Sequence, residues 1–261
     1  AGVYAVTRRF TDAEQFFQEA LVINRRLMQN APHTHEHDLG TTLTNLATLY
    51  STTKRFSDAE KVFQEALTLH RRLAQNNPLA YEPAVALTLN NLAGLYRATQ
   101  RVAEAEKAFE EVLAISRRLA KANLAAHEPG VARALNNLAI LRLDTQRYTE
   151  AEKALQEALT LSRRLARGHP DAHELSVATT LHNLAIVHAY TGRFTEAEKA
   201  FQEALKIYKR SAKANPRVYE PIVAGTLNNL SDLYRTMQRF TDADKAFMEA
   251  VNIRRNISKR E

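Results

Sequence analysis

The stretch that decides the fold is residues 82–123, which read EPAVALTLNNLAGLYRATQRVAEAEKAFEEVLAISRRLAKAN. Its first half spaces apolar side chains by three and four residues, at Leu89, Leu92, Ala93 and Tyr96. Residues at i, i+3, i+4 and i+7 share one face of an α-helix. Pro83 is expected in the first turn, where the missing N–H costs no hydrogen bond. The first half therefore predicts an amphipathic helix from about Pro83 to the break at Thr99-Gln100-Arg101.

The second half predicts another helix. Its inner face consists of Ala105, Phe109, Val112 and Leu113, extended by Leu119. Acidic residues open this helix and basic residues close it, which matches the helix dipole at both ends: Glu104, Glu106, Arg117 and Arg118. Asn77-Pro78, at the equivalent place one unit earlier, indicates where such a helix stops. The whole stretch is therefore expected to form a helical hairpin.

The hairpin recurs along the chain with a period of 46 residues. Equivalent positions hold Phe10, Phe56, Val102, Tyr148, Phe194 and Phe240, and a second set holds Asn45, Asn91, Asn137, Asn183 and Asn229. Self-similarity at a fixed period indicates one supersecondary unit stacked on copies of itself. We therefore predict an all-α fold, a right-handed α-α superhelical solenoid of antiparallel hairpins with about five and a half repeats.

We expect a single domain over residues 1–261, with hairpin units at about 1–30 (partial), 38–76, 83–122, 129–168, 175–214 and 221–259. The first ten residues align with 93–102, so the chain is expected to begin inside a first helix and to be a fragment of a longer array. The uncapped end would expose Val3, Tyr4 and Val6. End-to-end self-association is therefore expected.

The pattern Leu89-x2-Leu92-Ala93-x2-Tyr96…Ala105-x3-Phe109 resembles the tetratricopeptide repeat. The sequence of the repeat is similar to the longer repeats of kinesin light chains and of bacterial repeat proteins. Each unit has 46 − 34 = 12 residues more than the 34-residue form, and these are expected to lengthen the second helix and the link after it. Three positions depart from the pattern, because Arg142 and His188 replace the usual Tyr and Leu155 replaces the usual Phe.

Composition narrows the class of protein further. The chain has 36 Lys and Arg against 29 Asp and Glu and carries no Cys, which excludes disulfides, thiolate metal sites and a cysteine nucleophile. No apolar run is long enough for a membrane span, so no membrane partner is expected, and a cytoplasmic location is predicted. Acidic pairs such as Glu150 and Glu152 recur with the repeat, which is typical of solvated helix starts. No catalytic motif is found, so the chain is not expected to be an enzyme and no cofactor is expected.

Two other patterns allow alternative functions. His33, His35 and His37 could hold a metal on a loop, but His35 shares its repeat position with Tyr81 and His127, which favours packing, and no metal site is predicted. A ladder of basic pairs could follow nucleic-acid phosphates: Arg25-Arg26, Arg71-Arg72, Arg117-Arg118, Arg163-Arg164 and Lys209-Arg210. The same helices carry Glu residues that partly neutralise the ladder. Nucleic-acid binding is therefore kept as the less favoured alternative.

The resemblance implies that first helices line a concave groove that binds an extended peptide or a partner helix. In that groove one slot would hold Thr44, Asn90, Asn136, His182 and Asn228, and the next Asn45, Asn91, Asn137, Asn183 and Asn229. A carboxamide donates and accepts, which suits a peptide backbone, but the same ladder could instead tie neighbouring helices together. Specificity would come from variable positions: Arg97, Arg133, Leu143, Asp144, Tyr190, Asp232 and Arg235, with Arg142 and His188.

The leading hypothesis is a protein-interaction scaffold, with the specialised patch expected within residues 133–190. A ligand-sensing array within a larger signalling or defence protein is the other alternative.

Overall fold

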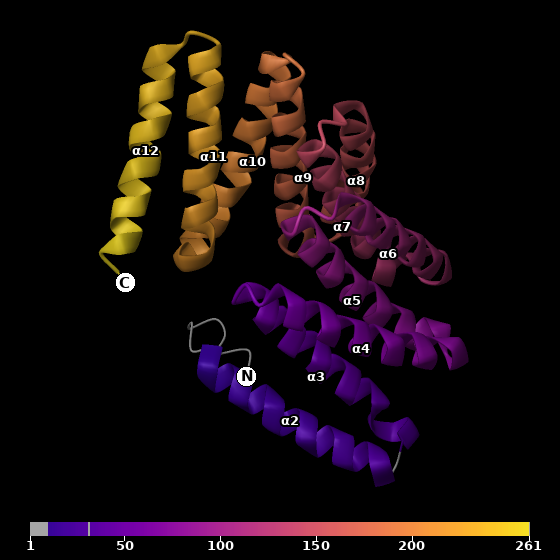
Figure 1. Ribbon diagram of the computed structural model, residues 1–261. Helices are drawn as coiled ribbons and strands as arrows, with labels where there is room; N and C mark the ends of the chain where they lie inside the picture. Colours follow the sequence, from indigo (N-terminus) through magenta and orange to yellow (C-terminus); the bar gives the residue numbers. More distant parts are fainter. Residues whose placement is uncertain (1–9, 31, 261) are drawn as a thin grey trace. The chain divides into compact units, whose positions relative to one another are not determined.

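The structure is a computed structural model that describes residues 10–30 and 32–260 (Figure 1). The described residues form consecutive helices: α2 (Phe10–Asn30), α3 (Pro32–Thr52), α4 (Phe56–Asn76), α5 (Pro78–Ala98), α6 (Val102–Ala122), α7 (Leu124–Asp144), α8 (Tyr148–Gly168), α9 (Pro170–Tyr190), α10 (Phe194–Ala214), α11 (Pro216–Thr236) and α12 (Phe240–Ser258). No described residue lies in a strand. The predicted all-α class is confirmed, because the described elements are all helices, and consecutive helices pack together from α2 to α6 and from α8 to α12.

The chain divides into two compact units, which are described separately. Unit one runs to Ala134 and unit two starts at Leu135, so the boundary between them lies inside α7. Odd-numbered helices are the first helices of the hairpins, and even-numbered helices are the second. The predicted segment before Phe10, including Val3, Tyr4 and Val6, lies outside the described residues.

From α4 onward, a single residue joins each second helix to the next first helix. Asn77 ends α4, and its side-chain oxygen accepts a 3.3 Å hydrogen bond from the backbone N–H of Ala80 in α5. Pro78 follows at the first helical position, where its missing N–H is harmless. Helix α5 therefore begins at Pro78, and the predicted start near Pro83 is wrong, because Pro83 lies inside the helix.

The short junction also contradicts the prediction that the extra residues of each repeat lengthen the second helix and the link after it. The extra residues extend the first helix as well as the second, so each of α3 to α11 spans 21 residues. His33, His35 and His37 were expected in a loop, but they lie in α3, which starts at Pro32 in the same way.

Within each hairpin the first helix ends in a left-handed turn. Gln100 has φ 61°, and the backbone N–H of Arg101 donates to the carbonyl of Tyr96 at 2.8 Å. This geometry ends an α-helix by satisfying its last carbonyl groups. After α9 the equivalent residue is Gly192, with φ 76°, which adopts this conformation without steric cost.

The predicted core faces are confirmed. Leu89, Leu92, Ala93 and Tyr96 are buried in α5, as are Ala105, Phe109, Val112, Leu113 and Leu119 in α6. The alanine that opens each second helix is fully buried, at Ala59, Ala105, Ala151, Ala197 and Ala243. A methyl side chain at this position allows the two helices of a hairpin to approach closely.

Candidate functional site

In unit two, asparagines tie first helices together. The side-chain amide of Asn136 in α7 donates to the hydroxyl of Thr180 in α9 at 2.8 Å. Asn183 in α9 donates in turn to the amide oxygen of Asn136 at 3.2 Å. Both asparagines are buried, with exposed fractions of 6% and 9%. At Asn136 and Asn183 these contacts favour a role in tying helices together over ligand binding, because buried polar groups need hydrogen-bond partners.

The next step of the ladder uses an imidazole. Asn229 in α11 donates its amide N–H to Nε2 of His182 in α9 at 3.2 Å, and Nδ1 of His182 lies 3.2 Å from the hydroxyl of Thr226. Burial lowers the pKa of His182, which favours the neutral ring that accepts from the Asn229 amide. Phe201 packs edge-on against this ring at 5.3 Å between centroids. The network fixes one end of Asn229, which remains partly exposed.

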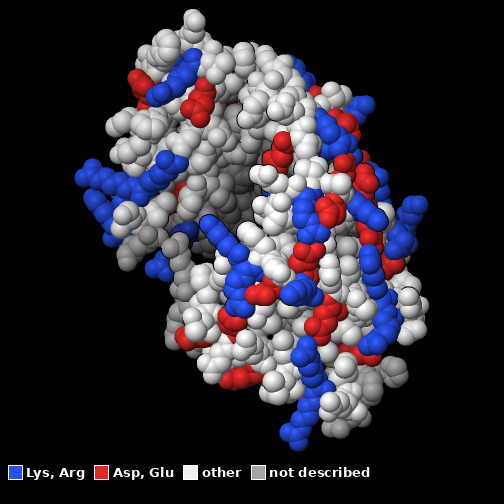
Figure 2. All heavy atoms as spheres, in the orientation of Figure 1, with Lys and Arg blue, Asp and Glu red and all other residues white. Residues whose placement is uncertain are grey.

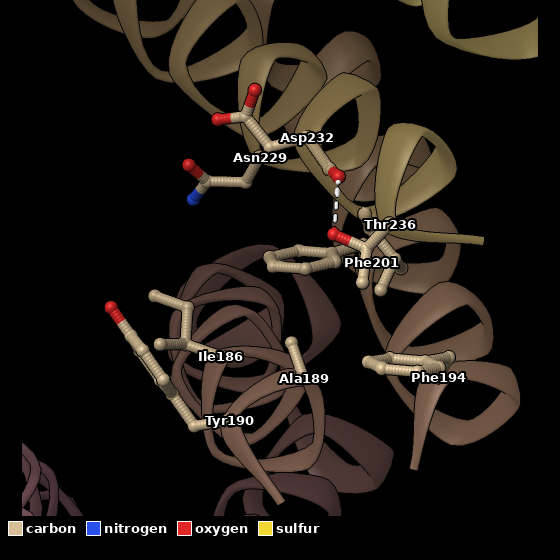
Figure 3. A pocket seen from close by; sticks show the side chains of 9 residues that line it. Ile186, Ala189, Tyr190, Phe194, Phe201, Asn229, Asp232 and Thr236 are labelled. Atoms are coloured by element: carbon tan, nitrogen blue, oxygen red, sulfur yellow. Dashed lines mark hydrogen bonds between the residues drawn. The ribbon is translucent and has the colours of Figure 1, made fainter. Parts of the chain in front are cut away.

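A pocket of about 410 Å³ opens beside Asn229 (Figure 3). It is lined by Ile186, Ala189, Tyr190, Phe194, Phe201, Asn229, Asp232, Leu233 and Thr236, from α9, α10 and α11. Figure 3 shows Ile186 and Tyr190 on the wall opposite Asn229 and Asp232. The Thr236 hydroxyl donates to the backbone carbonyl of Asp232 at 3.0 Å. An apolar floor with a few polar groups at its rim is typical of a ligand-binding site.

Unit one repeats the ladder with threonines. The hydroxyl groups of Thr44 and Thr88 lie 3.1 Å apart, and the Asn91 amide donates to the hydroxyl of Thr48 at 3.4 Å. Asn45 is exposed on α3, and Asn90 is partly buried on α5. Two variable positions predicted for specificity, Arg97 and Arg133, are also exposed.

The remaining predicted residues lie in unit two at different distances from the pocket. Asn137 is partly buried and Asp144 is exposed, both on α7. The carboxamide of Asn228 faces the guanidinium of Arg254 in α12. Arg235 lies 3.8 Å from the carboxylate of Asp244 in α12 and 5.9 Å from the ring of Phe247. Of the predicted site residues, the pocket brings together Tyr190, Asn229 and Asp232.

The two departures at the tyrosine position are accommodated by carboxylates. Nε of Arg142 lies 3.7 Å from a carboxylate oxygen of Glu150. Nδ1 of His188 lies 4.0 Å from Glu152. Burial and then the charge of Arg193 lower the pKa of His188, while the Arg193 hydrogen bond lowers that of Glu152. These residues therefore belong to hairpin packing in unit two, away from the pocket lining.

Much of the basic ladder is paired with carboxylates, some on the next second helix and others on the first helix of the same hairpin. N–O distances of 2.9, 2.7, 2.9 and 2.6 Å join Arg25 to Glu65, Arg71 to Glu111, Arg163 to Glu203 and Lys209 to Glu249. The second members pair as Arg72 with Glu36, Arg118 with Glu82 and Arg210 with Glu174. Figure 2 shows Lys and Arg interspersed with Asp and Glu over the visible face. The ladder is therefore partly neutralised by ion pairs.

The histidines near the first hairpin pack with aromatic rings. His37 lies 5.5 Å from Tyr81 and 5.8 Å from His70 between ring centroids, while Nδ1 of His35 is 3.8 Å from the Asp38 carboxylate. The side chain of His33 lies outside the described residues. Among those described, no three His, Asp or Glu side chains are grouped as metal ligands. None of the described helices has the length and apolar character needed to cross a membrane.

Sequence reasoning missed Phe194, Thr236 and Ile186 as parts of a site. Phe194 was recognised as a repeat position, without a role in binding. The available signal was the variation at one position, which holds Asp144, Tyr190 and Thr236 in successive repeats of unit two. The predicted patch, residues 133–190, overlaps the lining at Ile186, Ala189 and Tyr190, and the rest of the lining follows it in sequence.

Comparison with protein families gives consistent matches. Three family models of the tetratricopeptide repeat match the chain. The first matches residues 1–72, 84–164 and 130–210, the second matches 223–261, and the third matches 44–120. No curated protein sequence matches the chain.

Solved structures share the fold at low sequence identity. BtubC (BKLC) from P. vanneervenii is 23% identical with a TM-score of 0.76, over 95% of this chain and 92% of that one. A putative kinesin light chain with nearly identical TPR-like repeats from Podosopora anserina is 21% identical, with a TM-score of 0.60 over 85% of this chain and 97% of that one. A Rap protein complexed with competence and sporulation factor is 12% identical, with a TM-score of 0.60 over 99% of this chain and 74% of that one.

Proposed function

The chain belongs to the tetratricopeptide repeat family, and we propose that it is a protein-interaction scaffold that binds an extended peptide across α9 and α11. The observation that carries this proposal is the open apolar pocket between these first helices, with Tyr190, Asn229 and Asp232 at its rim. The proposed role is binding, with no catalytic step.

The chemistry of the rim suits a peptide main chain. The amide nitrogen of Asn229 is held by His182, which leaves its carbonyl oxygen and second N–H available to a ligand. A peptide backbone presents both a donor and an acceptor at each residue. The apolar lining below would bury one side chain of the same segment, so main-chain and side-chain recognition would occur together.

The environment of each asparagine separates the two readings of the ladder. Asn183 is buried and bonded to Asn136, so it serves the helix pair. Asn229 stands 46 residues later, is partly exposed and lines the pocket. We therefore assign ligand contact to Asn229 and a structural role to Asn183.

Peptide binding is favoured over nucleic-acid binding because of the ion pairs. Arg71 and Arg163 each contact a glutamate of the next second helix at less than 3.0 Å. A phosphate-binding surface requires cations whose charge is not already neutralised.

The proposal can be tested by selecting 12-residue peptides from a random display library with the whole chain. Fluorescence anisotropy would then give the Kd of each selected peptide for the original chain, Asn229→Ala, Tyr190→Ala and Asn45→Ala. The two pocket variants are expected to weaken binding about tenfold or more, because each removes a direct ligand contact. Asn45→Ala is the control, since Asn45 occupies the same repeat position in unit one and is exposed.

Circular dichroism would establish that each variant keeps its helical content. Peptides that bind both pocket variants as tightly as the original chain would refute the proposal. Failure of the library to yield any peptide would refute it as well.

A further inference from the structure

Helix α12 has an exposed apolar side besides the side that packs against α11 (Figure 1). Phe240, Phe247 and Met248 lie on this exposed side, with exposed fractions of 64%, 42% and 55%. Val251 follows Phe247 by four residues and Met248 by three, and Phe240 precedes Phe247 by seven. Residues with these spacings share one face of an α-helix, so the four side chains form a single surface, which we call the α12 face.

The corresponding face of the earlier second helices is buried. At the position of Phe247, helices α4, α6, α8 and α10 hold Phe63, Phe109, Leu155 and Phe201, each at most 3% exposed. The next first helix packs on such a second helix, as α5 does on α4 and α11 does on α10. Leaving a large apolar side chain in water forgoes roughly 1.5–3 kcal/mol of hydrophobic stabilisation. The α12 face is therefore a surface of the kind that the array elsewhere covers with a helix.

Met248 makes the α12 face more apolar than its counterparts. The equivalent residues are Gln18, Gln64, Gln156 and Gln202, with Glu110 in one repeat. Gln202 shows the role of the amide, because it donates a 3.2 Å hydrogen bond to the hydroxyl of Tyr234 in α11. Methionine has no N–H to donate. The α12 face is therefore less suited to a further first helix with that tyrosine than to an apolar surface like its own.

Two opposite charges flank the apolar centre of this face symmetrically. Asp244 stands four residues before Met248, and Arg255 stands four residues after Val251. Their spacing along the helix places both on the α12 face. If two copies of the helix lie antiparallel, with a twofold axis between Met248 and Val251, the Asp244 of each copy lies opposite the Arg255 of the other. The face is therefore complementary to itself in charge as well as in apolar character.

Neighbouring charges leave this pairing open. Arg235 of α11 lies 3.8 Å from the carboxylate of Asp244, and the two side chains are 54% and 75% exposed, so this contact is weak. Arg254, at the edge of the face, is directed to the carboxamide of Asn228 in α11. Arg255 is exposed. Both charges needed for the twofold contact are accessible to a partner.

We propose that two copies of this chain form a dimer through their α12 faces, with the two helices antiparallel across a twofold axis. Phe247, Met248 and Val251 form the apolar centre, and Asp244 of each protomer pairs with the partner's Arg255. A twofold contact closes on itself, so assembly stops at the dimer. Each protomer contributes one helix of 19 residues, about 28 Å long, so the interface is small and a Kd in the micromolar range is expected. The described pocket lining contains no residue of α12, so dimerisation is independent of peptide binding.

Sedimentation equilibrium of the whole chain between about 1 and 200 µM measures the association, and a monomer–dimer equilibrium is expected. Met248→Gln installs the residue of the earlier repeats and should weaken dimerisation about tenfold or more, because each dimer loses two apolar contacts. Its control is Leu79→Gln on α5, which removes a similarly exposed apolar side chain and should leave the Kd unchanged. Circular dichroism would establish that each variant keeps its helical content.

Charge reversal tests the antiparallel register. Asp244→Arg and Arg255→Asp should each weaken self-association at least about tenfold, because each sets like charges opposite one another at both ends of the contact. An equimolar mixture of these two single variants should associate as well as the original chain, since every charge then meets an opposite one. Energy transfer between chains labelled at their N-termini would follow this mixed dimer. The double variant Asp244→Arg/Arg255→Asp should also regain dimerisation.

A monomer throughout this concentration range would overturn the proposal, as would unchanged association of Met248→Gln or of either charge variant. Assemblies larger than a dimer would indicate head-to-tail stacking and would overturn the twofold contact. If both charge variants are weakened and their mixture stays weak, the two charges do not face each other, and the antiparallel dimer is overturned.

Discussion

Lowering the pH should destabilise unit one through a single buried imidazole. His70 in α4 is 2% exposed, and its Nδ1 lies 3.0 Å from the hydroxyl of Thr88. Among the described residues, Nε2 has no hydrogen-bond partner. Burial, with a smaller contribution from nearby His37, lowers the pKa of His70 from 6.5 to about 4. The folded chain therefore holds this ring neutral over a pH range in which the unfolded chain protonates it.

The sign and the size of this loss of stability follow from the difference in protons bound by the unfolded and folded states. Well above pH 6.5 both states are neutral at His70, so this residue gives no pH dependence there. As the pH falls from 6.5 towards 4, the unfolded state binds a proton that the folded state does not, and stability is lost. The loss is about 2 kcal/mol between pH 7 and pH 5, and about 3 kcal/mol when the range is complete.

Urea unfolding followed by circular dichroism at pH 7, 6 and 5 would measure this loss. The control is His70→Ser combined with Gly40→Ala, because the equivalent residues of the next repeat are Ser116 and Ala86. This double variant removes the titrating ring of His70 and places alanine at position 40, as at the equivalent position of the next repeat. Equal pH dependence of the unfolding free energy in the original chain and in the control would refute the reasoning.

Three further outcomes are expected. Gly40→Ala alone should destabilise the chain by about 2 kcal/mol, because its Cβ would collide with the ring of His70, and adding His70→Ser should restore most of that loss in thermal unfolding. Phe201→Ala should cost about 4 kcal/mol in urea unfolding, since this ring is 2% exposed and its removal leaves a cavity. Arg71→Ala should cost less than about 1 kcal/mol at 0.15 M salt, because its pair with Glu111 is solvent-exposed, and a larger effect would contradict this view of the ladder.

The fold could be predicted because the same periodic signal is repeated in register. Each copy independently places apolar residues three and four apart, so an ambiguous residue in one copy is resolved by the others. The helix starts were predicted less well. Pro83 resembles a first-turn proline, but Pro78 occupies that position, and the Asn77 side chain caps the helix five residues earlier. The signal that distinguishes the two prolines is local, since an asparagine at the cap position directly precedes Pro78 and a glutamate precedes Pro83.

The pocket could be predicted only in part, for a different reason. Asn229 was identified from the asparagine that recurs in every repeat, and Tyr190 from a position that varies between repeats. Phe194 and Thr236 come together only in space, because one lies at the start of α10 and the other at the end of α11. A cavity depends on volume that side chains leave empty, and periodicity in the sequence reports which residues are apolar rather than what they fill.

A repeat protein of this kind can therefore acquire a binding site without changing its framework. The backbone turn, the buried alanine and the hairpin contacts recur in α9–α12 and in α3–α6 alike. Tyr190 of one repeat is replaced by Thr236 in the next, and Ile186 by Asp232, and all four residues line the pocket. Because both positions are solvent-exposed, these changes cost little stability. The same two positions in the other hairpins are consequently where new ligand preferences could be introduced with the core intact.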